Sequence, residues 1–269
     1  MSQPSNPLAT PDAWNLVADD YADEIVPHFE KYAADALRLA AVTKGERLLD
    51  IAAGPGTLSI LAAGEARVTA LDFSEPMIAR LRANAERAGL SIDARVGDGM
   101  ALPFDEGTFD VACSMFGLIF FPDRGRGFRE AARVLRPGGR LVIASWTPLD
   151  RSPLLGEMFG AIGDELPGLP FSAGKAPLGE PDELAEEMTA GGFRDVRVVQ
   201  VTHAREAPSL DALWASWRRG NAPFVLLRGR LGDERWEALG EAVLARLRQR
   251  FGSGPQRVEM TANLGLGVR

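Results

Sequence analysis

The chain has 269 residues, of which 46% are hydrophobic and 25% are charged. This composition is typical of a folded globular protein with a large core, and it excludes a disordered chain. The formal net charge is -7 and the only lysines are Lys31, Lys44 and Lys175, so no basic patch favours a nucleic-acid partner. The longest apolar run, 111–121, is too short to span a bilayer, so no membrane partner is expected.

The cysteine content points to a reducing compartment. Cys113 is the only cysteine, so an intrachain disulfide is excluded. The N-terminal segment lacks the basic and apolar regions of a secretory signal. We therefore expect a cytoplasmic location.

The first 45 residues are predicted to precede the main sheet. A polar, proline-rich leader through Pro11 is expected to be mobile. Apolar residues then recur at helical spacing, namely Trp14, Val17, Tyr21, Ile25 and Phe29. We therefore assign 1–45 to a leader and one or two helices that cover the ligand-binding crevice.

Strands and helices alternate through the next hundred residues. Strands are predicted at about 47–52, 68–72, 91–96, 109–115 and 140–146, with helices at about 57–64 and 75–88. A further helix is expected to stop at 135–139. This alternation predicts an α/β fold with a parallel sheet covered on both faces, which binds ligands at the carboxyl ends of its strands.

The pattern changes after the fifth strand. A Pro/Gly-rich connection is expected through Pro181, followed by a helix near 182–190 and a strand near 196–203. Helical spacing returns at 210–217 and 234–251, and a strand-like run closes the chain at about 258–267. We therefore divide the chain into a core at 46–206, a helical cap insertion at 207–254 and a returning strand at 255–269. The insertion is either a lid over the crevice or a homodimer interface, and both interpretations stay open.

The most informative segment is Leu48–Ser59, which is followed by Asp72 at the end of the next strand. Gly54 and Gly56 lie in its strand-to-helix turn, where a missing Cβ lets backbone NH groups approach a ligand. The Asp72 carboxylate can accept hydrogen bonds from two ribose hydroxyls. The pattern suits a nicotinamide or flavin dinucleotide or S-adenosylmethionine, and a tight turn without a ligand is the alternative. Ser59 stands where the dinucleotide fingerprint has a third small residue, which weakens the dinucleotide interpretation.

Ordered motifs extend this pattern along the chain. They are Asp50–Gly56, Leu71–Met77, Gly97–Phe104, Phe109–Val111, Phe116–Leu118 and Leu135–Gly139. In order and spacing they resemble the class I S-adenosylmethionine-dependent methyltransferases, in particular the branch of quinone-biosynthesis C-methyltransferases. One departure is Ala52, where many relatives carry a glycine.

The resemblance covers about residues 14–146. It implies a Rossmann-like, seven-stranded, mostly parallel sheet with helices on both faces, N-terminal helices and a helical insertion before the last strand. It also implies methyl transfer from S-adenosylmethionine, with S-adenosylhomocysteine as the product.

The resemblance further implies roles for individual residues. The glycine turn would lie against the methionine portion of the cofactor, Asp72 would take the ribose hydroxyls, and Asp98 would accept from the adenine amino group. Phe73 and Met77 would flank the adenine, and Asp50 would orient the turn. The implied cofactor-binding residues are Trp14, Tyr21, Asp50, Ala52, Gly54, Gly56, Asp72, Phe73, Met77, Asp98, Gly99, Met100, Ser114 and Met115.

The acceptor is less constrained by the sequence. Phe116 and Trp146 at the crevice favour a small hydrophobic or aromatic molecule, methylated on oxygen, nitrogen or carbon. His28 is the candidate general base, and His203 is a weaker one. No cluster with metal-ligand spacing occurs in the sequence, so no metal is expected. The alternatives are a nicotinamide-dinucleotide oxidoreductase and a nonenzymatic S-adenosylmethionine-binding protein.

Overall fold

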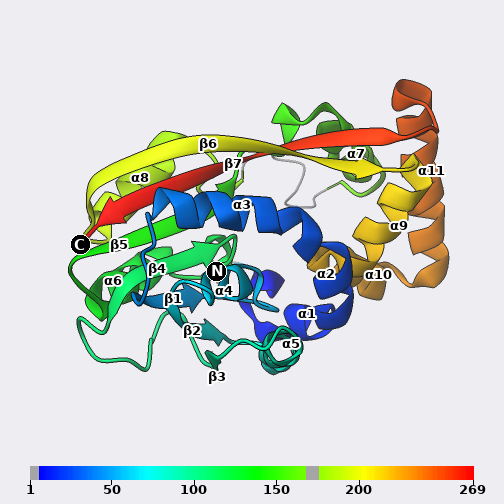
Figure 1. Ribbon diagram of the computed structural model, residues 1–269. Coiled ribbons are helices and arrows are strands. Elements are labelled where there is room, and N and C mark those ends of the chain that lie inside the picture. The colour runs from blue at the N-terminus through cyan, green and yellow to red at the C-terminus, as the bar shows by residue number, and fades with distance from the viewer. Residues whose placement is uncertain (1–5, 168–175) are drawn as a thin grey trace, which may run out of the picture.

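A computed structural model describes residues 6–167 and 176–269 of the chain (Figure 1). Its strands are β1 (Arg47–Ile51), β2 (Arg67–Asp72), β3 (Ile92–Val96), β4 (Phe109–Met115), β5 (Leu135–Trp146), β6 (Arg194–Ala207) and β7 (Gln256–Val268). Its α-helices are α1 (Pro11–Asn15), α2 (Ala18–Glu24), α3 (Val26–Leu39), α4 (Thr57–Ala62), α5 (Glu75–Arg87), α6 (Arg124–Val134), α7 (Pro153–Glu165), α8 (Pro181–Ala190), α9 (Leu210–Gly220), α10 (Ala222–Leu231) and α11 (Asp233–Phe251). Short 3-10 turns lie at η1 (Pro7–Ala9), η2 (Leu118–Phe120) and η3 (Leu149–Arg151).

All seven of these strands form one sheet in the order β3-β2-β1-β4-β5-β7-β6. The first five strands in this order pair in parallel, whereas β7 runs antiparallel to both of its neighbours. The α/β fold with a mostly parallel seven-stranded sheet is therefore confirmed. Because the strand order reverses between β1 and β4, a crevice is expected outside the carboxyl ends of these two strands.

Successive apolar residues of the strands pack against helices on opposite faces of the sheet. Leu48 packs with residues of α3 and α4 on one face, whereas the next residue, Leu49, packs with residues of α6 and α8 on the other. Both side chains are fully buried. Successive residues of β1 therefore bury opposite faces, as expected for a sheet between two helical layers.

A second core lies beyond the sheet. Figure 1 shows α9, α10 and α11 grouped at one end of the molecule, where the long pair β6 and β7 reaches them. Buried side chains of these helices pack with those of α7, and Trp236 at the centre is 0% exposed. The helices connect β6 to β7, so the segment predicted as an insertion contacts the sheet through its ends.

Two expectations from the sequence are corrected here. The predicted Pro/Gly-rich connection after Trp146 contains α7, which begins at Pro153 and buries Leu154, Leu155, Met158, Ala161 and Ile162 on one side. The leader is ordered from η1 onward, because Leu8 is buried at 8% exposure against the N-terminal helices. In both segments the burial of apolar side chains stabilises regular structure, although their proline and glycine content predicted loops.

Candidate active site

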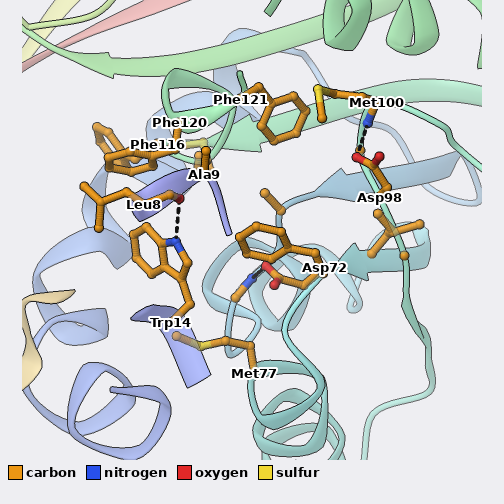
Figure 2. Close-up of a pocket in the computed structure, with 18 of the residues that line it drawn as sticks. Leu8, Ala9, Trp14, Asp72, Met77, Asp98, Met100, Phe116, Phe120 and Phe121 are labelled. Atoms are coloured by element: carbon orange, nitrogen blue, oxygen red, sulfur yellow. Dashed lines mark hydrogen bonds between the residues drawn. The ribbon is translucent and has the colours of Figure 1, made fainter. Parts of the chain in front are cut away.

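A pocket of about 710 Å³, including space open to solvent, lies at the carboxyl ends of the central strands. Figure 2 shows Trp14 and Leu8 on one side of the pocket and Asp72 on the other. Eleven of the predicted cofactor-binding residues line it, namely Trp14, Tyr21, Ala52, Gly54, Asp72, Phe73, Met77, Asp98, Gly99, Met100 and Met115. The structure thus gathers residues that are separated by up to a hundred positions in the chain.

The glycine turn and Asp72 are joined directly. Gly54 NH donates to Asp72 Oδ2 at 2.8 Å, and Ser74 NH donates to Oδ1 at 2.9 Å (Figure 2 draws the first of these). Burial raises the pKa of Asp72 to about 6, although backbone hydrogen bonds from Ser74, Gly54 and Phe73 oppose this shift. Asp72 is therefore mostly ionised at neutral pH, and each oxygen keeps a lone pair for a ligand.

Gly54 has φ of +54° and no atom within 4 Å of the place where a Cβ would lie. It lines the pocket, so a side chain there would enter the space for a ligand. Ala52 and Phe116 also have positive φ, +57° and +60°, a conformation that costs a side-chain-bearing residue about 1–2 kcal/mol. Strain of this kind clusters at binding sites, and here it flanks the pocket.

Asp50 lies under the turn and is almost fully buried. Ser59 Oγ donates to Asp50 Oδ2 at 2.7 Å. Burial, with a smaller contribution from the charge of Asp72, raises the pKa of Asp50 to about 7. Asp50 lines a second cavity, of about 370 Å³, together with residues of the turn such as Gly54. Ser59, noted in the sequence only as a departure from the dinucleotide pattern, is the hydrogen-bond donor to this carboxylate.

Two predicted cofactor-binding residues do not line these cavities. Gly56 has φ of +94°, and a Cβ there would lie 2.7 Å from Leu81 Cγ, so this glycine is needed for the turn into α4 and its packing. Ser114 is fully buried, and its Oγ accepts a hydrogen bond from Leu118 NH at 3.2 Å. Both residues shape the backbone around the pocket from behind.

Beyond the turn, one edge of the pocket lining combines the polar side chain of Asp98 with the apolar side chains of Phe73 and Met77. Asp98 Oδ1 accepts a hydrogen bond from Met100 NH at 2.8 Å, which shapes the loop after β3. Phe73 and Met77, from the loop after β2 and the start of α5, supply apolar surface. Such an edge suits a flat heterocycle with an exocyclic amine.

The N-terminal segment forms the opposite wall. Trp14 Nε1 donates to Leu8 O at 3.0 Å, and Ser74 Oγ donates to Asn15 Oδ1 at 2.7 Å. Arg80 of α5 forms ion pairs with Asp19 and Asp23 of α2. Leu8 and Ala9 line the pocket although they fall in the leader that was expected to be mobile. A single buried leucine in a proline-rich stretch is a weak signal, and sequence reasoning missed it.

A third cavity, of about 1330 Å³ including space open to solvent, adjoins the first. Its lining is mostly aromatic and aliphatic, and it contains both predicted acceptor-binding residues, Phe116 and Trp146. These two rings stack at 3.9 Å between centroids, with 11° between their planes.

Tyr21 lines all three cavities, which places it at their junction. Burial and the charge of Asp72 raise the pKa of the Tyr21 hydroxyl, so it stays protonated at neutral pH.

The two histidines have different surroundings. His28 lines the third cavity, where burial and the charges of Arg205 and Lys31 lower its pKa to about 4. It is therefore uncharged at neutral pH. His203 lies 2.6 Å from Asp35 Oδ2 through its Nε2 and does not line these cavities.

The described residues hold neither a candidate metal site nor a membrane-spanning helix. Within 6–167 and 176–269, no group of three or more His, Cys, Asp or Glu side chains could hold a metal ion. In the same ranges, no helix has the length and apolar character needed to cross a membrane.

Comparisons with known proteins indicate which family of proteins has this pocket. Residues 49–143 match the family described as methyltransferase domain. The chain is 34% identical over 175 residues to the demethylmenaquinone methyltransferase of Thermus thermophilus, an alignment that covers 59% of this chain and 79% of that protein. It is 37% identical over 160 residues to an uncharacterized protein of Mycobacterium tuberculosis, covering 58% of this chain and 55% of that one. The chain thus spans about half the length of that relative.

The fold is shared with solved structures. The YcgJ protein of Bacillus subtilis superposes with a TM-score of 0.61 at 18% identity, covering 89% of this chain and 98% of that one. The order of the strands and the glycine turn next to Asp72 agree with the methyltransferase family that the sequence comparisons indicate. The chain belongs to the class I S-adenosylmethionine-dependent methyltransferases.

The residues present fit the family's cofactor. The open space beside Gly54 accommodates a ligand that a side chain would exclude. Asp72 is a buried carboxylate at a strand end with free lone pairs, as a ribose diol requires. Asp72 is mostly ionised at neutral pH and Asp50, in the adjoining second cavity, is about half ionised, so this region carries negative charge that favours a cofactor with a sulfonium and an ammonium group.

Proposed function

We propose that this protein transfers a methyl group from S-adenosylmethionine to a small hydrophobic or aromatic acceptor. The observation that carries the proposal is the aromatic cavity that meets the cofactor pocket at Tyr21 and Phe116. The name of the Thermus relative, a demethylmenaquinone methyltransferase, also supports a small-molecule acceptor. The methylated atom is left open among oxygen, nitrogen and carbon.

The cofactor supplies an electrophilic methyl group on a sulfonium, which an acceptor attacks in line. In our proposal Asp72 binds the ribose, and the turn at Gly54 with Asp50 holds the methionine end. Tyr21 lies at the junction with the acceptor cavity, where its protonated hydroxyl can donate a hydrogen bond. Such positioning contributes on the order of 7–11 kcal/mol to lowering the barrier of a two-reactant step.

Proton removal differs between acceptor classes. We retain His28 as the candidate base, because its imidazole lines the acceptor cavity and is uncharged at neutral pH. A pKa of about 4 makes it a weak base. It would therefore serve acceptors that are already acidic better than alcohols or amides.

We also propose that the segment 207–254 closes the acceptor cavity. The support is that Trp217 of α9 and Asn221, Ala222 and Pro223 at the start of α10 line it. A lid role leaves the outer surface of α11 free for a second copy of the chain. Gel filtration with light scattering would test the dimer interpretation separately.

The test has two steps. Calorimetric titration with S-adenosylmethionine should give one site, and NADH should give none; the reverse result would favour a dinucleotide oxidoreductase. S-adenosylmethionine with a deuterated methyl group is then incubated with phenols, quinols, amines and aromatic acids, and the products are read by mass spectrometry. His28→Gln and the matched His203→Gln variant separate the candidate base from the histidine outside the cavities. Binding without transfer to any acceptor would favour a nonenzymatic role.

A further inference from the structure

The acceptor cavity contains a buried cation. Arg205, on β6, lines the cavity and is only 9% exposed. The surrounding wall is apolar and aromatic, and no carboxylate occurs among its lining residues within the described ranges. Arginine stays protonated in proteins, so a positive charge faces an apolar space.

The guanidinium is incompletely paired. Its Nη2 donates to Ser216 Oγ, and its Nε is buried without a hydrogen-bond partner. Within the described residues, no carboxylate forms an ion pair with it at 4.0 Å or less. Glu24, whose charge acts on Arg205 from a greater distance, forms its ion pair with Arg219. The ring of Trp217 lies 5.8 Å from the guanidinium carbon. A buried cation without a carboxylate is costly, so a ligand anion would offset a penalty already present in the fold.

A second feature of the same cavity favours negative charge. The ten-residue helix α10 begins with Asn221 at its N-cap, followed by Ala222 and Pro223, and all three line the same cavity as Arg205. The Asn221 side chain makes no capping hydrogen bond to this helix. Pro223 has no NH and the Phe224 NH donates to Asn221 O at 2.9 Å, so this end offers an anion the Ala222 NH and the positive end of the helix dipole.

We propose that Arg205 and the N-terminus of α10 bind a carboxylate of the methyl acceptor. The inference rests on the proposed function, since it assigns this cavity to the acceptor. The guanidinium fork matches a carboxylate and can donate two parallel hydrogen bonds to it. The apolar body of the acceptor packs on the stacked rings of Phe116 and Trp146, which directs it toward Tyr21. The substrate class is thus an aromatic or hydrophobic carboxylic acid.

The experiment compares acids with neutral molecules of the same shape. Benzoate, 2-naphthoate and octanoate are each paired with the corresponding amide, and binding is followed by quenching of tryptophan fluorescence, since Trp14, Trp146 and Trp217 line the cavity. Wild-type protein should bind at least one acid about 30-fold more tightly than its amide. In Arg205→Gln the preference should vanish while affinity for the amide is unchanged, and Arg205→Lys should restore part of it.

Arg257→Gln is the matched control. It removes the same charge from the neighbouring strand β7 at an exposed side chain that pairs with Glu206 and Glu259, so it should leave the preference intact. The inference is overturned if the wild type binds no acid more tightly than its amide, or if Arg205→Gln keeps the preference. Calorimetry with S-adenosylmethionine on the same preparations reports on the proposed function separately. Normal cofactor binding without an acid preference would reject this inference alone.

Discussion

Replacing Asp50 with asparagine should stabilise the protein without ligand and weaken its cofactor binding. Asp50 is almost fully buried and hydrogen-bonded to Ser59, whose hydroxyl can donate to an asparagine oxygen equally well. The substitution therefore keeps the shape and the hydrogen bond and removes only the buried charge. A charge that costs stability in the free protein is retained, in our interpretation, because it faces the cationic end of the cofactor.

The size of the effect follows from the pKa of Asp50, which is about 7 in the fold against the ordinary aspartate value of 3.8. Between pH 5 and pH 7 the carboxyl is ionised in the unfolded chain and protonated in the folded one. A raised carboxyl pKa means that the folded state binds the proton more tightly, so wild-type stability falls as pH rises through this window. Each unit is worth about 1.4 kcal/mol, so the advantage of Asp50→Asn should grow by about 3 kcal/mol over these two units.

Urea unfolding at pH 5 and pH 8 measures how the stability advantage of Asp50→Asn changes with pH. The difference between variant and wild type is the quantity to compare, because Asp72 and His28 also have shifted pKa values and contribute to both proteins. Asp105→Asn, the same change at an exposed side chain, should stay within about 0.5 kcal/mol at both pH values. An advantage of Asp50→Asn that does not change between the two pH values would refute the reasoning. Cofactor affinity at pH 8 should fall by at least about tenfold in the variant.

Three further predictions concern the pocket and the second core. Gly54→Val should cost about 1–2 kcal/mol because of its positive φ and should abolish cofactor binding by calorimetry, whereas Gly64→Ala, at a position with open space and no positive φ, should do neither. Asp72→Ala should weaken binding of S-adenosylmethionine about 100-fold, since two hydrogen bonds to a carboxylate are lost, and unchanged affinity would contradict the ribose assignment. Trp236→Ala, at a fully buried position, should lower the free energy of unfolding by about 3–5 kcal/mol in urea titrations, and a loss below about 1 kcal/mol would argue against a packed helical core there.

The sheet was predictable because its signals are local. Apolar runs such as 109–115 are short, and the intervening helical spacing leaves a parallel arrangement as the simple solution. The residues of the candidate cofactor pocket were predictable for the same reason, since Gly54, Asp72 and Asp98 each lie at or just after a strand end. The helix α7 was missed because its single glycines and its N-terminal proline mimic a loop, and it is stabilised by tertiary packing, chiefly against α11.

The sequence by itself determined the fold class, the glycine turn and most of the residues that line the pocket beside this turn, because each depends on periodicity or on a short motif. Only the tertiary structure decided that Gly56 and Ser114 lie behind the pocket, and that Leu8 closes it from the leader. The acceptor cavity also came from the tertiary structure. Arg205 belongs to no motif. Its proposed role follows from its burial in an apolar cavity that the start of α10 also lines, and linear spacing does not encode this arrangement in space.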